Sequence, residues 1–90
     1  MSLTVLVVDD EKNARENIAA FLKKKKYEAL EAGTIKDAKK ILAEDSADVV
    51  LLDVQLPDGL GTALLEEVAS KPGAPPIILI TAHGDIDMAV

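Results

Sequence analysis

Three short apolar runs recur along the chain, at residues 5–8, 49–52 and 77–80. None of them alternates apolar with polar residues, and all are rich in β-branched side chains. Continuous apolar runs of this length are typical of strands that are buried on both faces, as in a parallel sheet. We therefore predict three interior strands.

The segments between these runs carry apolar residues at helical spacing, which predicts helices around residues 14–22 and 35–42. The second helix begins after Thr34, and Asp37 three residues later makes this start similar to a capping box. A third helix is predicted over residues 60–69, ending before Lys71-Pro72-Gly73. The apolar positions of these patterns are Ala14, Ile18, Phe21, Leu22, Ile35, Ala38, Ile41, Leu42, Leu64, Leu65 and Val68.

Residues 27–32 have fair helix propensity and only a loose period of two, but their place between two helices favours an edge strand. A last helix is predicted to begin near Asp85. Strands then alternate with helices along the chain. This order predicts one α/β domain over residues 1–90, with a parallel sheet, right-handed crossovers and helices on both faces.

Composition narrows the function classes. Hydrophobic residues make up 49% and charged residues 29%, as in a globular protein, and the net charge of −6 disfavours direct binding to nucleic acid. Without cysteine the chain has no disulfide, iron–sulfur cluster or cysteine-based zinc site, whereas a metal with oxygen ligands remains open. No apolar run is long enough for a membrane span and no signal peptide is visible, so we expect a cytoplasmic protein without membrane contact.

Acidic residues follow the predicted strands. Asp9 and Asp10 come after the first strand, Asp53 after the third and Thr81 after the fourth. Parallel strands end at the same edge of a sheet, so we expect these side chains to converge. Carboxylates gathered in one crevice repel one another, and Mg²⁺ suits the site because it takes one or two carboxylates together with waters and a phosphate oxygen.

Each of these residues also has a purely structural interpretation. An Asp pair after a strand is often a helix N-cap, and Asp53 fits a turn former before Pro57-Asp58-Gly59. The run Lys23-Lys24-Lys25-Lys26 fits a solvated helix end, where cations complement the helix dipole. The combination of residues at the ends of separate strands favours a functional site.

Together these residues resemble the receiver domains of response regulators, and the resemblance covers the whole chain. It implies a flavodoxin-like doubly wound parallel sheet with strand order 2-1-3-4. The last segment is similar to receivers of nitrogen-regulation-type, enhancer-binding transcription activators. The segments that carry the resemblance are Val7-Val8-Asp9-Asp10-Glu11, Leu51-Leu52-Asp53-Val54-Gln55-Leu56-Pro57-Asp58-Gly59, Ile80-Thr81-Ala82 and His83-Gly84-Asp85.

The resemblance implies a role for each matching residue. Asp53 would be the phosphoacceptor. Asp10 would bind Mg²⁺ directly, Asp9 through water, and Gln55 through its main-chain carbonyl. The remaining positions, which would contact the phosphoryl group through a hydroxyl and a backbone N–H, are Thr81 and Ala82.

The same resemblance implies a sensor histidine kinase as phosphoryl donor and an output domain outside this chain, which we expect to bind DNA. Such a module is not a turnover enzyme. Receivers continue into a fifth strand with a lysine and a fifth helix, which this sequence lacks, so we expect an incomplete receiver. Residues 77–80 would then form an exposed edge that pairs with a second chain in a homodimer, or belong to a longer protein.

Three other functions are alternatives to a switching receiver. The first is a receiver-like interaction domain, or a fragment, that keeps the fold without switching. A magnesium-dependent phosphatase with an aspartate nucleophile would need a carboxylate two residues after Asp53, where Gln55 stands. A flavodoxin-type carrier would need a Ser-, Thr- and Gly-rich phosphate loop after the first strand, whereas Asp9-Asp10-Glu11 would repel phosphate.

Overall fold

The computed structural model describes residues 3–44, 47–80 and 86–89. It consists of a main sheet with strand order β2-β1-β3-β6-β7 and a small two-stranded sheet, β4-β5. In chain order the elements are β1 (Thr4–Val8), α1 (Lys12–Lys24), β2 (Glu28–Ala32), α2 (Ile35–Glu44), β3 (Val49–Asp53), β4 (Gln55–Leu56), β5 (Gly59–Leu60), α3 (Gly61–Ala69), β6 (Ile77–Ile80) and β7 (Ile86–Ala89).

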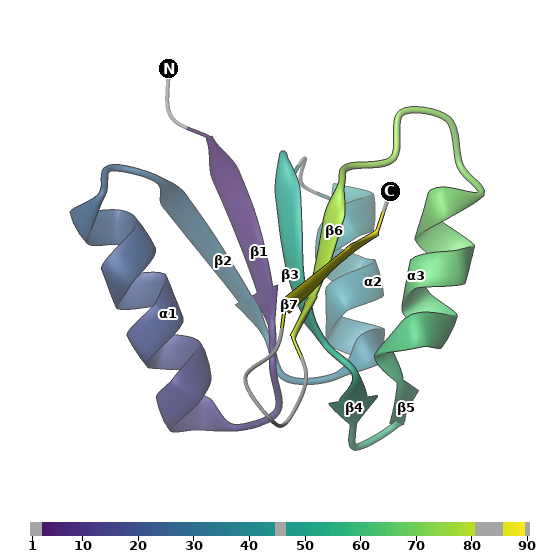
Figure 1. Cartoon of the computed structure of the whole chain (residues 1–90), viewed down its shortest axis with the longest axis horizontal. Coiled ribbons are helices and arrows are strands. Elements are labelled where there is room, and N and C mark those ends of the chain that lie inside the picture. The colour runs from purple at the N-terminus through teal and green to yellow at the C-terminus, as the bar shows by residue number, and fades with distance from the viewer. Residues whose placement is uncertain (1–2, 45–46, 81–85, 90) are drawn as a thin grey trace.

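The four strands β2, β1, β3 and β6 lie side by side and are parallel, as the sequence predicts (Figure 1). The predicted order 2-1-3-4 is therefore confirmed, with β6 as the fourth strand. All four strands end at the same edge, at the bottom of Figure 1. The weakest prediction, a strand within residues 27–32, is also confirmed, because β2 pairs with β1 along its whole length.

The helices cover both faces of the sheet. Leu6 and Val8 of β1 belong to one buried cluster with Ala38 of α2 and Leu64 of α3. Successive residues of a strand point to opposite faces, so the equally buried Val5 and Val7 face away from that cluster. α1 contacts β1 and β2, and we place it over this second face.

Residues 86–89 correct the prediction of a last helix near Asp85. They form β7, which runs antiparallel to β6 and pairs with it from Ile77 to Ile80. In sequence, Ile86 and Met88 alternate with Asp87 and Ala89, which is the period of a strand. The outer edge of β6 also offers backbone N–H and C=O groups that a neighbouring strand satisfies. The prediction that residues 77–80 form an exposed edge is therefore wrong. β7 of the same chain pairs with the side of β6 where we expected a second chain.

Phe21 departs from the predicted inward-facing pattern of α1. Its side chain is 59% exposed, and its ring centroid lies 5.7 Å from the Lys25 ammonium nitrogen. Ala19 is the buried residue of this helix. Two residues of helix correspond to about 200° of rotation, so Phe21 lies on the opposite side of α1 from Ala19.

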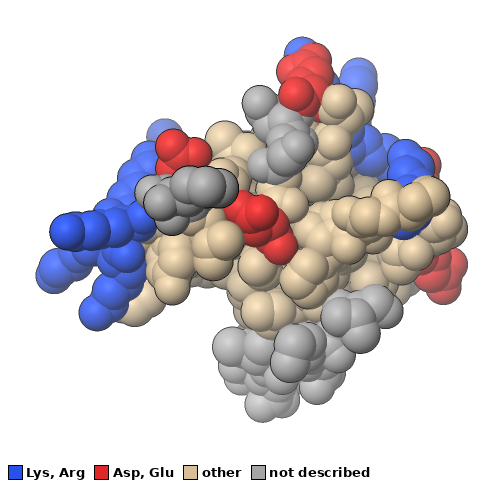
Figure 2. Space-filling view, turned by 90° about the horizontal axis from the view of Figure 1, so that it is seen from above, with Lys and Arg blue, Asp and Glu red and all other residues tan. Residues whose placement is uncertain are grey.

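The lysine run at the end of α1 is solvated, as predicted. All four lysines are exposed, and Lys23 and Lys24 form the last turn. Figure 2 views the molecule from the edge where the strands begin and shows Lys and Arg atoms gathered at the left, over this end of α1. None of the helices in the described part of the chain has the length and apolar character that a membrane crossing needs.

Candidate functional site

Three aspartates meet at the edge where the parallel strands end. Asp9, Asp10 and Asp53 each offer one carboxylate oxygen, and these oxygens lie within 4.8 Å of one another. The cause is the register of the sheet: Val8 of β1 pairs with Leu52 of β3, so the next residues, Asp9 and Asp53, lie side by side. The structure thus brings together three of the predicted site residues, which we call the acidic cluster.

The main chain around Asp9 is fixed by several hydrogen bonds. Its N–H donates to the carbonyl of Ala32 over 3.0 Å, and its Oδ1 accepts from the N–H of Glu11 over 3.0 Å. Asp10, between these two anchored residues, is exposed. The acid pair is therefore held on a short, ordered turn with Asp10 facing solvent.

Arg15 supports this turn and was missed by sequence reasoning. Its Nη1 donates to the carbonyl of Asp9 over 2.9 Å, and its Nε lies 3.2 Å from Oε1 of Glu31 on β2. The guanidinium thus ties α1 to the ends of β1 and β2. The one signal in the sequence was its place near the start of the helix that follows the acidic pair.

The structural interpretation of these aspartates as caps does not hold. The N-cap residue of α1 is Glu11, and no side-chain hydrogen bond caps this helix. Asp53 is the last residue of β3, whereas the turn lies further on, at Pro57-Asp58 between β4 and β5. Neither Asp10 nor Asp53 is placed by the demands of a cap or a turn.

A tight connection follows Asp53. The N–H of Val54 donates to the carbonyl of Ile80 over 3.2 Å, and its carbonyl accepts from the N–H of Gly61 over 2.6 Å. Gln55 then opens β4 and pairs with Leu60. The main chain of Gln55, whose carbonyl is the predicted ligand, is therefore anchored two residues from Asp53.

Asp58, at the turn of this hairpin, has a structural role that the sequence did not reveal. Its Oδ1 accepts from the N–H of Ile35 over 2.9 Å and its Oδ2 from the N–H of Lys36 over 3.1 Å. The bond from Ile35, joined by that from Lys36, lowers the pKa of the Asp58 carboxyl below its ordinary value. No local signal predicts this contact, because Asp58 lies 23 residues from Ile35 in sequence.

Thr81 and Ala82, predicted to contact a phosphoryl group, lie outside the described residues, as does His83. Their roles remain predictions. Ile80, the residue before Thr81, pairs with Asp53 in the register of β3 and β6.

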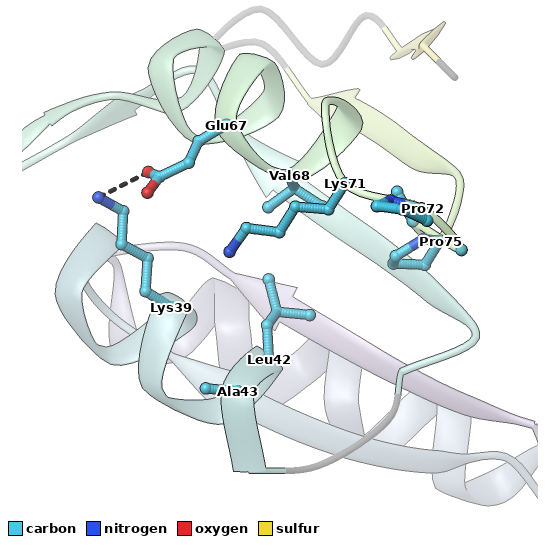
Figure 3. Close-up of a pocket in the computed structure, with 10 residues that line it drawn as sticks. Lys39, Leu42, Ala43, Glu67, Val68, Lys71, Pro72 and Pro75 are labelled. Carbon is cyan, nitrogen blue, oxygen red and sulfur yellow. Dashed lines mark ion pairs between the residues drawn. The ribbon is translucent and has the colours of Figure 1, made fainter.

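A hollow of about 240 Å³ lies elsewhere, between α2, α3 and the loop before β6 (Figure 3). Lys39 and Glu67 form an ion pair of 2.7 Å beside it, and the hydrogen bond from Lys39 lowers the pKa of Glu67. Lys71 extends across the space above Leu42 in Figure 3. None of the residues that line this hollow belongs to the acidic cluster. The candidate site is thus separate from this hollow, and Asp10 is the exposed member of its three aspartates.

The donor set of the acidic cluster suits a hard divalent cation. Mg²⁺ is commonly held by one or two carboxylates, with waters and a phosphate oxygen completing its octahedron. A carboxylate beside such an ion can also act as a nucleophile towards a phosphoryl group. The arrangement therefore allows metal-assisted phosphoryl transfer onto an aspartate.

Comparison with known proteins identifies a family for this chain. Residues 5–90 match the response regulator receiver domain. The chain is 35% identical over 85 residues to the response regulator protein PilR of Pseudomonas aeruginosa, covering 94% of this chain and 19% of that protein. It is 40% identical over 92 residues to an NtrX-like response regulator of Rickettsia bellii, covering 98% and 19%.

Among solved structures, the MaeR response regulator bound to beryllium trifluoride superimposes with a TM-score of 0.82 and 34% identity. The match covers 89% of this chain and 67% of that chain. The chain thus spans about a fifth of the length of the curated relatives and about two thirds of this solved structure.

Proposed function

Because this chain belongs to the receiver domain family of response regulators, we propose that Asp53 accepts a phosphoryl group from a sensor histidine kinase in the presence of Mg²⁺. The observation that carries the proposal is the acidic cluster, whose three carboxylate oxygens lie within 4.8 Å of one another at the edge where the parallel strands end. The domain is a signalling module of two-component systems and does not turn over an external substrate.

In the proposed reaction, a carboxylate oxygen of Asp53 attacks the phosphorus of a phosphohistidine. A new O–P bond forms, the P–N bond breaks, and the histidine of the kinase leaves with the bonding electrons and regains a proton. The product on this chain is an acyl phosphate. Mg²⁺, when bound, supplies charge neutralisation on the transferring phosphoryl oxygens.

Other residues of this chain would bind the metal ion and the phosphoryl group. Asp10, the most exposed carboxylate of the cluster, would bind the ion directly, and Asp9 would act through water. Gln55 would add its main-chain carbonyl. After transfer, Thr81 would donate its hydroxyl to a phosphoryl oxygen, and Ala82 would donate its backbone N–H.

The proposed setting is the cytoplasm, with an output domain outside this chain that binds DNA and regulates transcription. Asp10 is exposed and Asp53 is partly exposed, which suits a kinase domain that must reach the phosphoacceptor. We propose no direct contact of this chain with nucleic acid, because its net charge of −6 would repel a polyanion.

The test is to treat the 90-residue chain with acetyl phosphate and Mg²⁺ and to locate the adduct by mass spectrometry. We expect one phosphoryl group, on Asp53, and none in Asp53→Asn. Asp48→Asn is the matched control, because Asp48 accepts from the N–H of Thr4 at the opposite edge of the sheet, over 2.8 Å. Labelling of another aspartate, or no labelling of folded protein, would favour a receiver-like domain that does not switch.

A further inference from the structure

The β4-β5 hairpin is fastened to α2 at its turn. The two carboxylate oxygens of Asp58 accept separately from the N–H groups of Ile35 and Lys36, over 2.9 and 3.1 Å. These are the first two N–H groups of α2 and have no acceptor within the helix. The negative charge of Asp58 also lies at the positive end of the helix dipole.

Packing reinforces this attachment. Leu56 of the hairpin is 8% exposed and belongs to the buried core cluster. A Cβ added to Gly59, which has a φ of +151°, would lie 3.0 Å from Cδ1 of Ile35. The hairpin turn therefore lies directly on the first turn of α2. Ile35 makes both a polar contact, with Asp58, and an apolar contact, with Gly59.

The other end of the hairpin is joined to the acidic cluster. Val54 connects Asp53 to Gln55, and its carbonyl accepts from the N–H of Gly61 over 2.6 Å. The hairpin thus spans from the cluster to α2. Only two residues, Leu56 and Pro57, separate Gln55 from Asp58.

We propose that Asp58 is a positioning residue for the metal site. By fastening the hairpin turn to α2, it holds the main chain of Gln55 at the edge where Asp10 and Asp53 bind the ion. Occupancy of the site is then coupled in both directions to the first turn of α2. This inference rests on the proposed function, because it assumes that the acidic cluster binds Mg²⁺.

A carboxylate is suited to this position because it offers one oxygen to each of two N–H groups. An amide offers one oxygen only, and its NH₂ group would face a second donor. The third N–H of the helix, that of Asp37, is satisfied separately by the Thr34 hydroxyl over 3.0 Å. Replacing Asp58 therefore loosens the hairpin while the cap from Thr34 stays.

The experiment follows backbone amide NMR signals of the 90-residue chain during titration with Mg²⁺ alone. In the wild type, the amides of Asp10 and Glu11 report binding, and those of Ile35 and Lys36 report the coupling. Asp58→Ala should weaken Mg²⁺ binding about tenfold, as loss of an outer partner of a metal site does. At saturation Asp10 and Glu11 should still respond, whereas Ile35 and Lys36 should not.

Two further variants make the result specific. Asp58→Asn keeps one acceptor, so its affinity should lie between the wild type and Asp58→Ala. Asp48→Ala removes a carboxylate that also accepts from a backbone N–H, at the opposite edge, and should bind Mg²⁺ like the wild type. Unchanged affinity in Asp58→Ala, or an equal loss in Asp48→Ala, would overturn the proposal. A wild type in which Asp10 and Glu11 do not respond would instead overturn the proposed function, and this inference with it.

Discussion

The α carbon of Gly61 lies against the main-chain carbonyl of Asp53, a residue of the acidic cluster. A Cβ at this position would clash with that oxygen and would lie 3.1 Å from a side-chain carbon of Leu52. A backbone oxygen cannot rotate away as a flexible side chain can. The first residue of α3 must therefore be a glycine if the hairpin is to close on Val54.

Gly61→Ala should lower the free energy of unfolding by about 2 kcal/mol or more, because relief of the clash requires a shift of β3 or α3. Urea denaturation followed by circular dichroism measures the loss. Gly73→Ala is the control. Gly73 has a φ of +73° but no atom within 4 Å of an added Cβ, so its cost should be only the backbone term of about 1 kcal/mol. Equal losses in both variants would show that the close approach at Gly61 has no role.

Among individual residues, the sequence predicted the positions of those that directly follow a strand. Asp9, Asp10 and Asp53 were predictable because a parallel sheet brings the ends of its strands to one edge. Arg15 and Asp58 were not predictable, because their partners are set by tertiary packing. Asp58, interpreted from sequence as part of a turn, accepts from a helix that begins 23 residues earlier.

At the N-terminus of α2, side chains accept hydrogen bonds from the first three backbone N–H groups. The sequence predicted the contribution of Thr34, and the structure confirms it with the bond from the N–H of Asp37. The structure adds Asp58, which accepts from the two preceding N–H groups. The start of this helix thus depends partly on the protonation state of a residue in another element.

The contribution of Asp58 to stability should depend on pH. Its hydrogen bonds lower its pKa in the folded state below the ordinary value of 3.8. A group whose pKa is lowered by folding stabilises the folded state above its unfolded pKa, and this stabilisation is lost as the pH falls through the folded value. Asp58→Asn should therefore be less stable than the wild type at pH 7, and the difference should shrink as the pH falls below about 4.

Urea midpoints of both proteins at a series of pH values measure this difference. Asp48→Asn serves as the control, because it removes the same charge at the opposite edge of the sheet, where Asp48 accepts from the N–H of Thr4. A gap between wild type and Asp58→Asn that stays constant from pH 7 to pH 3 would contradict the assigned role of the Asp58 carboxylate.

Most of the topology of the whole molecule was predictable, because alternating apolar runs and amphipathic segments admit few arrangements. The end of the sheet was not. Residues 86–89 were predicted as the start of a helix, yet they pair with β6. The backbone groups on the edge of β6 need hydrogen-bond partners, and this requirement cannot be read from the sequence of residues 86–89 alone.

The core of the molecule rests on few large side chains. Leu52, in the central strand β3, is fully buried with 0% exposure. Leu52→Ala should lower the free energy of unfolding by about 2–5 kcal/mol, a large part of the stability of a small domain. Leu3→Ala, at a side chain that is 50% exposed, should change it by no more than about 0.5 kcal/mol. Urea denaturation of both variants provides the comparison, and a similar loss in both would show that β3 is not central to the core.

The most direct measurement is the Mg²⁺ concentration that gives half-maximal phosphorylation of Asp53 by acetyl phosphate, compared between the wild type and Asp10→Asn. If the three carboxylates form one site, Asp10→Asn should need at least about tenfold more Mg²⁺, because a direct ligand is lost. Asp48→Asn, with the same change of charge at the opposite edge, should match the wild type. Phosphorylation of Asp53 with the same Mg²⁺ dependence in Asp10→Asn and the wild type would contradict the assignment of the acidic cluster as a metal-dependent phosphoacceptor site.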